Sequence, residues 1–112
     1  WVVDGPLATA GTEAEPATGL FFADVDEVAA ADAVGRLKPQ SSIAFSETVT
    51  TVAWRDKPTT YVITEQDAIF PLPAQEALAA RSGSTAVRMD TSHSPFLSKP
   101  ADLADIIENA LG

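Results

Sequence analysis

Two stretches in the second half of the chain decide the fold: TTYVITEQDAIFP at residues 59–71 and TAVRMDTSHSPF at residues 85–96. The first begins with a β-branched and aromatic run, Thr59–Thr64, which lacks a clean alternation of polar and apolar residues. Such a run is typical of a strand that is buried on both faces of a parallel sheet. The second stretch begins with another short strand, Thr85–Met89. Both strands are therefore expected in a sheet that helices cover on both faces.

Helical signals separate and follow these two strands. A helix is expected to open at Pro73 and to end before Gly83, which is placed as its C′ residue. After Pro100, apolar residues recur at the spacing of an amphipathic helix. They are Leu103, Ile106, Ile107, Ala110 and Leu111. The order strand, helix, strand, helix implies that the two strands are parallel neighbours, because antiparallel strands do not need a helical crossover.

Two strands alone make a poor parallel sheet, because such sheets usually have more strands and need cover on both faces. We therefore expect α/β architecture in which residues 59–112 form the final part of a doubly wound sheet that is incomplete in this chain. The chain starts at Trp1, without an initiator Met or a signal peptide. We expect that it begins partway through a longer gene product.

The charged turn Arg55–Pro58 divides the chain into two expected segments. Residues 55–112 carry the strand-helix-strand-helix core, and residues 1–54 are assigned to an N-terminal loop and a helical cap. Glycine, proline and small residues punctuate residues 1–19, which predicts a loop there.

Two helices are expected in the cap segment. The first covers Val25–Leu37, where apolar residues recur near helical spacing and either Asp24 or Asp26 serves as the N-cap. The second runs from Pro39 toward Trp54, because Pro39 suits a first helical turn and a broad apolar face follows it.

The composition excludes several classes of function. With 7 basic and 16 acidic residues, the formal charge of −9 argues against a nucleic-acid partner, which is bound chiefly through Lys and Arg. The absence of cysteine excludes disulfides and thiol catalysis, and a single His argues against a zinc site, so we expect neither metal nor cofactor. No apolar stretch approaches the roughly 20 residues that cross a bilayer, so we expect a soluble protein without a membrane partner. A composition without cysteine is compatible with the cytoplasm and with export, and we favour the cytoplasm.

Each predicted strand is followed by a loop that carries one residue of a catalytic type, Asp67 after the first and His93 after the second. The carboxyl ends of parallel strands meet at one edge of the sheet, where open α/β sheets bind their ligands. A carboxylate on one imidazole nitrogen stabilises the imidazolium that forms when the other nitrogen takes a proton from a serine. By itself, an Asp in a polar loop is most often a turn or cap residue. Placement at this edge favours catalysis, and Glu65 competes with Asp67 for the role of acid.

These loops carry a family resemblance. Tyr61-Val62-Ile63-Thr64, followed by Asp67, Pro71 and Gln75, is similar to the acid loop of α/β-hydrolase fold serine esterases. Ser92–Pro100 resembles the histidine loop of one group in that fold, the plant methylesterases and hydroxynitrile lyases with their bacterial esterase relatives. Residues 21–54 are similar, less closely, to the small cap of the same group.

The resemblance implies a carboxylic ester hydrolase with a Ser-His-Asp catalytic triad, in which His93 is the general base and then the acid while Asp67 orients it. The chain contains no Gly-x-Ser-x-Gly nucleophile elbow and no His-Gly loop for an oxyanion hole. We therefore expect the serine on a missing N-terminal hydrolase segment, which would be a partner of this chain, and we expect this chain alone to be inactive. The substrate would be a small apolar ester, and the serine mechanism needs no cofactor.

The other residues of these loops receive more limited roles. Phe70 and Phe96 are the aromatic residues that we expect to touch substrate, although aromatic side chains are more often core. Ser92 and Ser94 lack the strand-to-helix elbow of a nucleophile, so they are expected to support the loop. Lys99 is expected at the start of the last helix and not in a hydroxynitrile lyase site.

Three alternative functions stay open at this point. The complete protein would be a hydroxynitrile lyase, or a non-catalytic hydrolase-fold protein that binds a small apolar ligand. The 112 residues would otherwise be a stand-alone interaction subunit. Exposed strand edges argue against the last alternative, because an unpaired edge invites aggregation.

Overall fold

Two parallel strands form the centre of the C-terminal half in the computed structural model, which describes all residues from 1 to 112. β4 (Thr60–Thr64) pairs with β5 (Thr85–Met89) in register over the full length of both strands. The sheet contains only these two strands, so each keeps one edge that is not paired with another strand. The expected parallel pairing, and the expected incompleteness of the sheet, are therefore confirmed.

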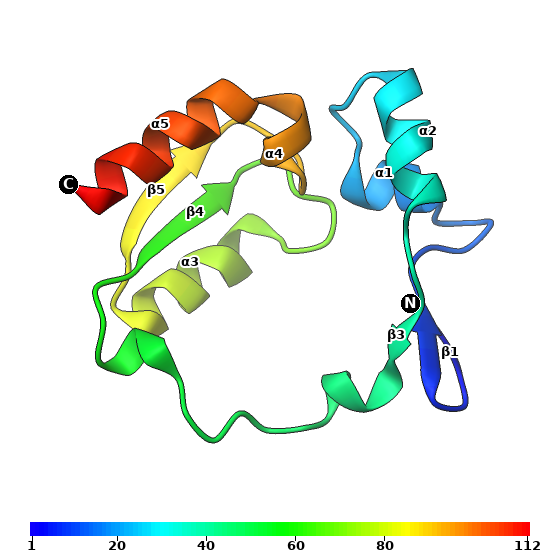
Figure 1. The fold of residues 1–112 in the computed structure, drawn as a ribbon, viewed down its shortest axis with the longest axis horizontal. Helices are drawn as coiled ribbons and strands as arrows, with labels where there is room; N and C mark the ends of the chain where they lie inside the picture. The colour runs from blue at the N-terminus through cyan, green and yellow to red at the C-terminus, as the bar shows by residue number, and fades with distance from the viewer.

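The helices of this half begin and end close to the predicted residues. α3 (Leu72–Ser82) connects the two strands, and Gly83 follows it in the left-handed region with φ of +65°. That conformation favours glycine, so Gly83 is the C′ residue that the sequence predicts. The short helix α4 (Pro95–Ser98) precedes the amphipathic helix α5 (Pro100–Leu111). Figure 1 shows α3 and α5 on either side of the two strands.

The prediction that residues 1–19 form a loop is wrong for their first half, which contains two strands. β1 (Val2–Asp4) and β2 (Leu7–Thr9) form an antiparallel hairpin, and β3 (Gln40–Ser41) adds a third strand beside β2. The hairpin closes through a two-residue turn whose first residue, Gly5, has φ of +56°. Glycine at that position is what a type II′ hairpin turn requires. The Gly-Pro pair that was interpreted as loop punctuation is therefore the turn between two strands.

Two helices follow the hairpin, α1 (Ala17–Phe21) and α2 (Glu27–Gly35). The second lies within the predicted helix, whereas α1 begins in the segment predicted as a loop, residues 1–19, and ends two residues beyond it. The N-cap of α2 is Asp26, whose Oδ1 accepts a hydrogen bond of 3.0 Å from the amide of Ala29. Asp24 was the alternative cap, and it has a different partner.

The second predicted cap helix, from Pro39 toward Trp54, is wrong. The segment contains β3, two short 3₁₀ turns at Ser42–Phe45 and Ala53–Arg55, and irregular chain between them. The irregular part includes five consecutive β-branched residues, Thr48–Val52. Such residues lose side-chain freedom in a helix, which costs free energy. Burial does not offset that cost at Val49, which is 70% exposed.

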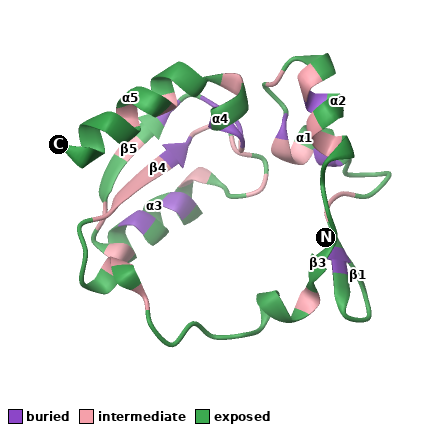
Figure 2. Cartoon of the chain, viewed as in Figure 1, coloured by how far each residue is buried: buried purple, intermediate pink, exposed green.

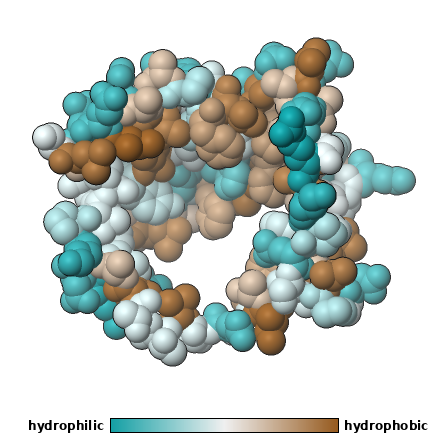
Figure 3. Space-filling model, viewed as in Figure 1, coloured by the Kyte–Doolittle hydropathy of each residue, from teal (hydrophilic) through white to brown (hydrophobic).

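Buried side chains are few, 13 of 112 residues, and they gather mainly at the carboxyl ends of β4 and β5 and in the loop that follows β5 (Figure 2). In the space-filling view the molecule is open, with hydrophobic residues gathered over α4 and α5 (Figure 3). No helix has the length and apolar character needed to span a membrane. The edge where β4 and β5 end is thus the part of the molecule in which side-chain positions are most tightly determined.

Candidate functional site

Asp67 lies in the loop after β4 and accepts four hydrogen bonds. Its Oδ1 accepts from the amides of Ile69, at 2.8 Å, and Phe70, at 3.0 Å. Its Oδ2 accepts from the hydroxyl of Thr64, at 2.8 Å, and lies 2.8 Å from His93 Nδ1. Burial by itself would raise the pKa of Asp67, but these hydrogen bonds favour the carboxylate more strongly, so the pKa lies below the usual value. Asp67 is therefore an anion that the loop holds in one orientation.

His93 lies in the loop after β5 and faces Asp67 across the edge of the sheet. Because the side chain of Asp67 is only 4% exposed and that of His93 is 27% exposed, the carboxylate lies beneath the imidazole. An anion at Nδ1 favours the tautomer that carries its proton on Nδ1 and leaves Nε2 as a base. Nε2 makes no hydrogen bond within the chain. The structure thus brings together the two residues that the sequence assigned to acid and base, while their catalytic roles stay predictions.

Two phenylalanine rings lie against the imidazole of His93. Phe70 stacks on it, with centroids 6.2 Å apart and planes at 13°. Phe21, which ends α1 in the cap segment, meets it edge-on, with centroids 5.3 Å apart and planes at 80°. The ring of His93 is therefore restricted by apolar contacts on two sides as well as by the carboxylate.

Glu65, the competing acid, is occupied elsewhere. Its Oε2 lies 3.4 Å from Arg88, which also pairs with Glu76 on α3. These two carboxylates raise the pKa of the Arg88 guanidinium above its usual value. The hydrogen bonds therefore assign the imidazole contact to Asp67 and not to Glu65.

Gln75 on α3 supports the acid loop from below and is 2% exposed. Its Oε1 accepts from the amide of Thr64 at 2.9 Å, while its Nε2 donates to the carbonyls of Thr64 at 2.8 Å and Phe70 at 2.7 Å. The side chain thus acts as an additional strand residue beside the end of β4. Gln75 is one of the residues that carry the family resemblance, but the sequence alone assigned it no role. Its hydrogen bonds show that it supports the acid loop.

The two serines beside His93 are buried, as expected for residues that support the loop. Ser92 donates from both its amide and its hydroxyl to the carboxylate of Asp24, 68 positions earlier in the chain. No local sequence signal indicates this contact, because acidic residues are common throughout the cap segment. The contact between Phe21 and His93 was missed because it joins residues that are far apart in the chain. Lys99 is exposed at the N-cap position of α5, which agrees with its predicted placement.

A shallow pocket opens beside the acid and the histidine. Phe70 and Phe96 both line it, together with Asp67, Gln75 and His93. The structure therefore places both predicted aromatic residues in the pocket that His93 also lines, and both are exposed. Whether either one touches a substrate stays a prediction.

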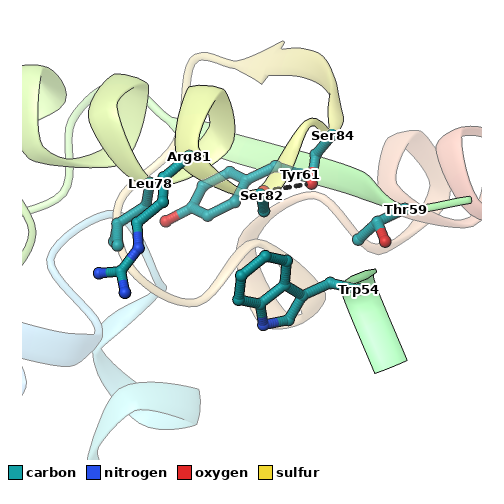
Figure 4. Close-up of a pocket in the computed structure, with 7 residues that line it drawn as sticks. All are labelled: Trp54, Thr59, Tyr61, Leu78, Arg81, Ser82 and Ser84. Atoms are coloured by element: carbon teal, nitrogen blue, oxygen red, sulfur yellow. Dashed lines mark hydrogen bonds between the residues drawn. The ribbon is translucent and has the colours of Figure 1, made fainter. Parts of the chain in front are cut away.

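A second pocket, with walls from Trp54, Tyr61 and Leu78, lies at the opposite end of β4 (Figure 4). Its polar residues include Ser82 and Ser84, whose hydroxyls are 2.6 Å apart. It contains neither the acid nor the histidine, so we place the candidate site at the other end of the strand. No cluster of three or more His, Asp or Glu side chains is arranged to hold a metal ion.

Comparison with known proteins agrees with this fold. The profile described as "Alpha/beta hydrolase family" matches residues 3–106. Polyneuridine aldehyde esterase superposes with a TM-score of 0.72 at 16% identity, over 95% of this chain and 48% of that one. A histidine-to-alanine mutant of that esterase superposes with a TM-score of 0.69 at 16% identity, over 92% and 47% of the two chains. This chain thus spans about half the length of these structures, and no curated protein matches it.

The family match extends over both halves of the chain, so the hairpin and helices of residues 1–54 are part of the same fold as the two parallel strands. Along the chain, the hairpin and helices of residues 1–54 come first, the loop with Asp67 second and the loop with His93 last. The chain belongs to the alpha/beta hydrolase family.

Proposed function

We propose that the protein hydrolyses carboxylic esters, and that this chain supplies the acid and the base of a Ser-His-Asp triad. One observation carries the proposal: a buried, anionic Asp67 lies 2.8 Å from Nδ1 of His93 at the carboxyl edge of parallel strands. The esterase named among the structural neighbours supports the choice of esters within the family.

In the proposed reaction, Nε2 of His93 removes the proton of a serine hydroxyl while the serine oxygen attacks the ester carbonyl. The resulting imidazolium is stabilised by Asp67, which keeps its negative charge throughout. Collapse of the tetrahedral intermediate breaks the bond to the alkoxy group, which leaves as an alcohol with the proton from Nε2. Water then attacks the acyl-enzyme by the same route and releases the carboxylic acid.

We place the serine and the oxyanion donors on a complementary hydrolase segment, the partner predicted from the sequence. The unpaired edge of β4 supports this placement, because an additional parallel strand there would satisfy its free backbone groups. The strand order of the sheet would then continue away from β5. The exposed rings of Phe70 and Phe96 would form one wall of a site for a small apolar ester.

The test is a comparison of His93→Ala with the parent in the complete protein, with short-chain p-nitrophenyl esters as substrates. Loss of a triad base is expected to lower kcat on the order of 10⁶-fold. Lys99→Ala is the matched control, since Lys99 is six positions away in the same loop region and is exposed. Full hydrolysis by His93→Ala would rule out the assignment.

A non-catalytic ligand-binding protein is the second candidate, and the apolar pocket beside His93 is the observation that favours it. The two functions differ in their reaction with an alkyl fluorophosphonate, which labels an activated serine. Covalent labelling that depends on His93 supports the esterase. Reversible binding of an apolar ester without turnover or labelling supports the binding protein.

A further inference from the structure

The segment between α1 and α2 reaches the histidine loop through a single carboxylate. Asp24 accepts a hydrogen bond of 2.8 Å from the amide of Ser92 to its Oδ2, and a second from the Ser92 hydroxyl to its Oδ1. Ser92 is 1% exposed and immediately precedes His93. These are the only hydrogen bonds that Ser92 donates, so both of its buried donors depend on Asp24.

The last residue of α1, just before this segment, touches the imidazole itself. Phe21, three positions before Asp24, meets the ring of His93 edge-on at 5.3 Å. The cap segment therefore contacts the histidine at two levels, at its ring through Phe21 and at the backbone before it through Asp24. Burial opposes ionisation of Asp24, but the bonds from Ser92 lower its pKa below the usual value, so the contact is charge-assisted at neutral pH.

Asp67 alone does not hold the loop in place. Its hydrogen bond to Nδ1 orients the ring, whereas the position of the ring depends on the backbone that carries it. Loss of Asp24 would leave a buried amide and a buried hydroxyl without partners, and such groups move toward water when they can. A displacement of the base by about 1 Å is enough to lower a reaction rate on the order of 10²-fold.

We propose that Asp24 is a positioning residue of the site, which fixes the backbone of Ser92 and thereby the place of His93 relative to the serine. This inference rests on the proposed esterase function. It assigns to the cap segment a role in the geometry of the base, in addition to any role as a cover.

The chain offers a matched control for this role. Asp26 is an exposed aspartate two positions away that also accepts a hydrogen bond from a backbone amide, that of Ala29 within α2. Asp26→Ala removes a helix cap without touching the histidine loop. Asp24→Asn is the conservative variant, because its amide oxygen can accept from the Ser92 amide while its NH₂ donates to the Ser92 hydroxyl.

The experiment measures kcat, KM and the hydrogen exchange of the Ser92 amide in the complete protein. We expect Asp24→Ala to lower kcat by about 10- to 100-fold with little change in KM, because the base is displaced and the ester pocket is retained. We expect the Ser92 amide to exchange faster in the same variant, since it loses its partner. Asp24→Asn should recover most of kcat, and Asp26→Ala should leave both readouts near those of the parent.

Parent-like kcat and parent-like Ser92 exchange in Asp24→Ala would overturn the proposal. An equal fall of kcat in Asp26→Ala would do so as well, because the effect would then follow from general loss of cap stability. If Asp24→Ala does not fold, Ser92→Ala removes one of the two bonds and gives the same test with a smaller expected effect. Failure of the esterase function is recognised separately, by a parent that hydrolyses no ester or by an active His93→Ala, and the exchange of the Ser92 amide still tests the contact.

Discussion

Residues 1–54 and residues 55–112 differ in how deeply the side chains that bond to their backbone are buried. In the C-terminal half, side chains complete the bonding of the backbone: Gln75 binds the end of β4, and Asp67 accepts from two amides of its own loop. In the N-terminal half, a hairpin and short helices are joined by irregular chain, much of it exposed. A catalytic pair needs fixed geometry, and the half that carries Asp67 and His93 is the half with buried polar networks.

The comparison also shows that the two halves are not independent. Asp24 and Phe21 both contact the histidine loop. The more irregular half therefore adds to the order of the regular one at the histidine loop. The following substitutions compare how much side chains of each half contribute to the free energy of unfolding.

The largest stability effect is expected from Gln75→Leu. This change removes the side-chain partner of the Thr64 amide and of the Phe70 carbonyl beneath the acid loop. The Thr64 carbonyl keeps its bond from the Asp67 amide. We expect a loss of about 3 kcal/mol in the free energy of unfolding, because unsatisfied buried groups cost about 1–3 kcal/mol each. Gln40→Leu is the control, since Gln40 is an exposed residue of β3 in the other half. Equal losses in urea unfolding would contradict the contrast between the halves.

A somewhat smaller effect is expected from Asp67→Asn. At neutral pH the variant should lose about 2 kcal/mol, the order of magnitude of hydrogen bonds to a charged group. Since the pKa of Asp67 is lowered in the folded state, its carboxylate contributes stability above the unfolded pKa of about 3.9. That contribution is lost as the pH falls through the folded pKa.

Urea unfolding of parent and Asp67→Asn at pH 7 and at acidic pH checks this sign. The difference between the two proteins should narrow as the pH falls from about 4, where the carboxylate of the unfolded parent begins to protonate, through the lower pKa of the folded state. Asp26→Asn is the control, because asparagine is an equally good N-cap for α2. A constant difference across this range would show that the charge of Asp67 does not stabilise the fold.

An effect of about 1 kcal/mol is expected from Gly83→Ala, because a side chain at φ of +65° is strained although nothing crowds it. Gly35→Ala, at the end of α2, should be neutral or slightly stabilising, since Gly35 has no positive φ and open space around it. Thermal unfolding of the two variants compares one helix end in each half. An equal loss of stability in the two variants would mean that the positive φ of Gly83 is not the cause.

The smallest effect is expected from Val49→Ala in the irregular chain. Val49 is 70% exposed, so the free energy of unfolding should change by less than about 0.5 kcal/mol. Chemical denaturation measures this change. A loss above about 1 kcal/mol would mean that the segment is packed against another part of the complete protein.

Local patterns were sufficient where several of them agreed. The apolar spacing after Pro100, the β-branched run before Asp67 and the position of Gly83 all predicted elements that the structure contains. In residues 39–54 the signals disagreed, because an apolar face favoured a helix while the β-branched run opposed it. The segment forms no α-helix, so the helix predicted from the apolar face was wrong.

The sequence by itself determined the parallel strands, the helices around them and the order of the acid and histidine loops, because each depends on residues close together in the chain. Only the tertiary structure decided that Asp67 and not Glu65 meets the imidazole, and that Asp24 binds Ser92 while Asp26 caps α2. In both cases two acidic residues lie two positions apart, and local propensity does not distinguish them. The contacts that separate the candidates, from Asp67 to His93 and from Asp24 to Ser92, join distant segments, so the choice depends on how the folded chain places one loop beside another.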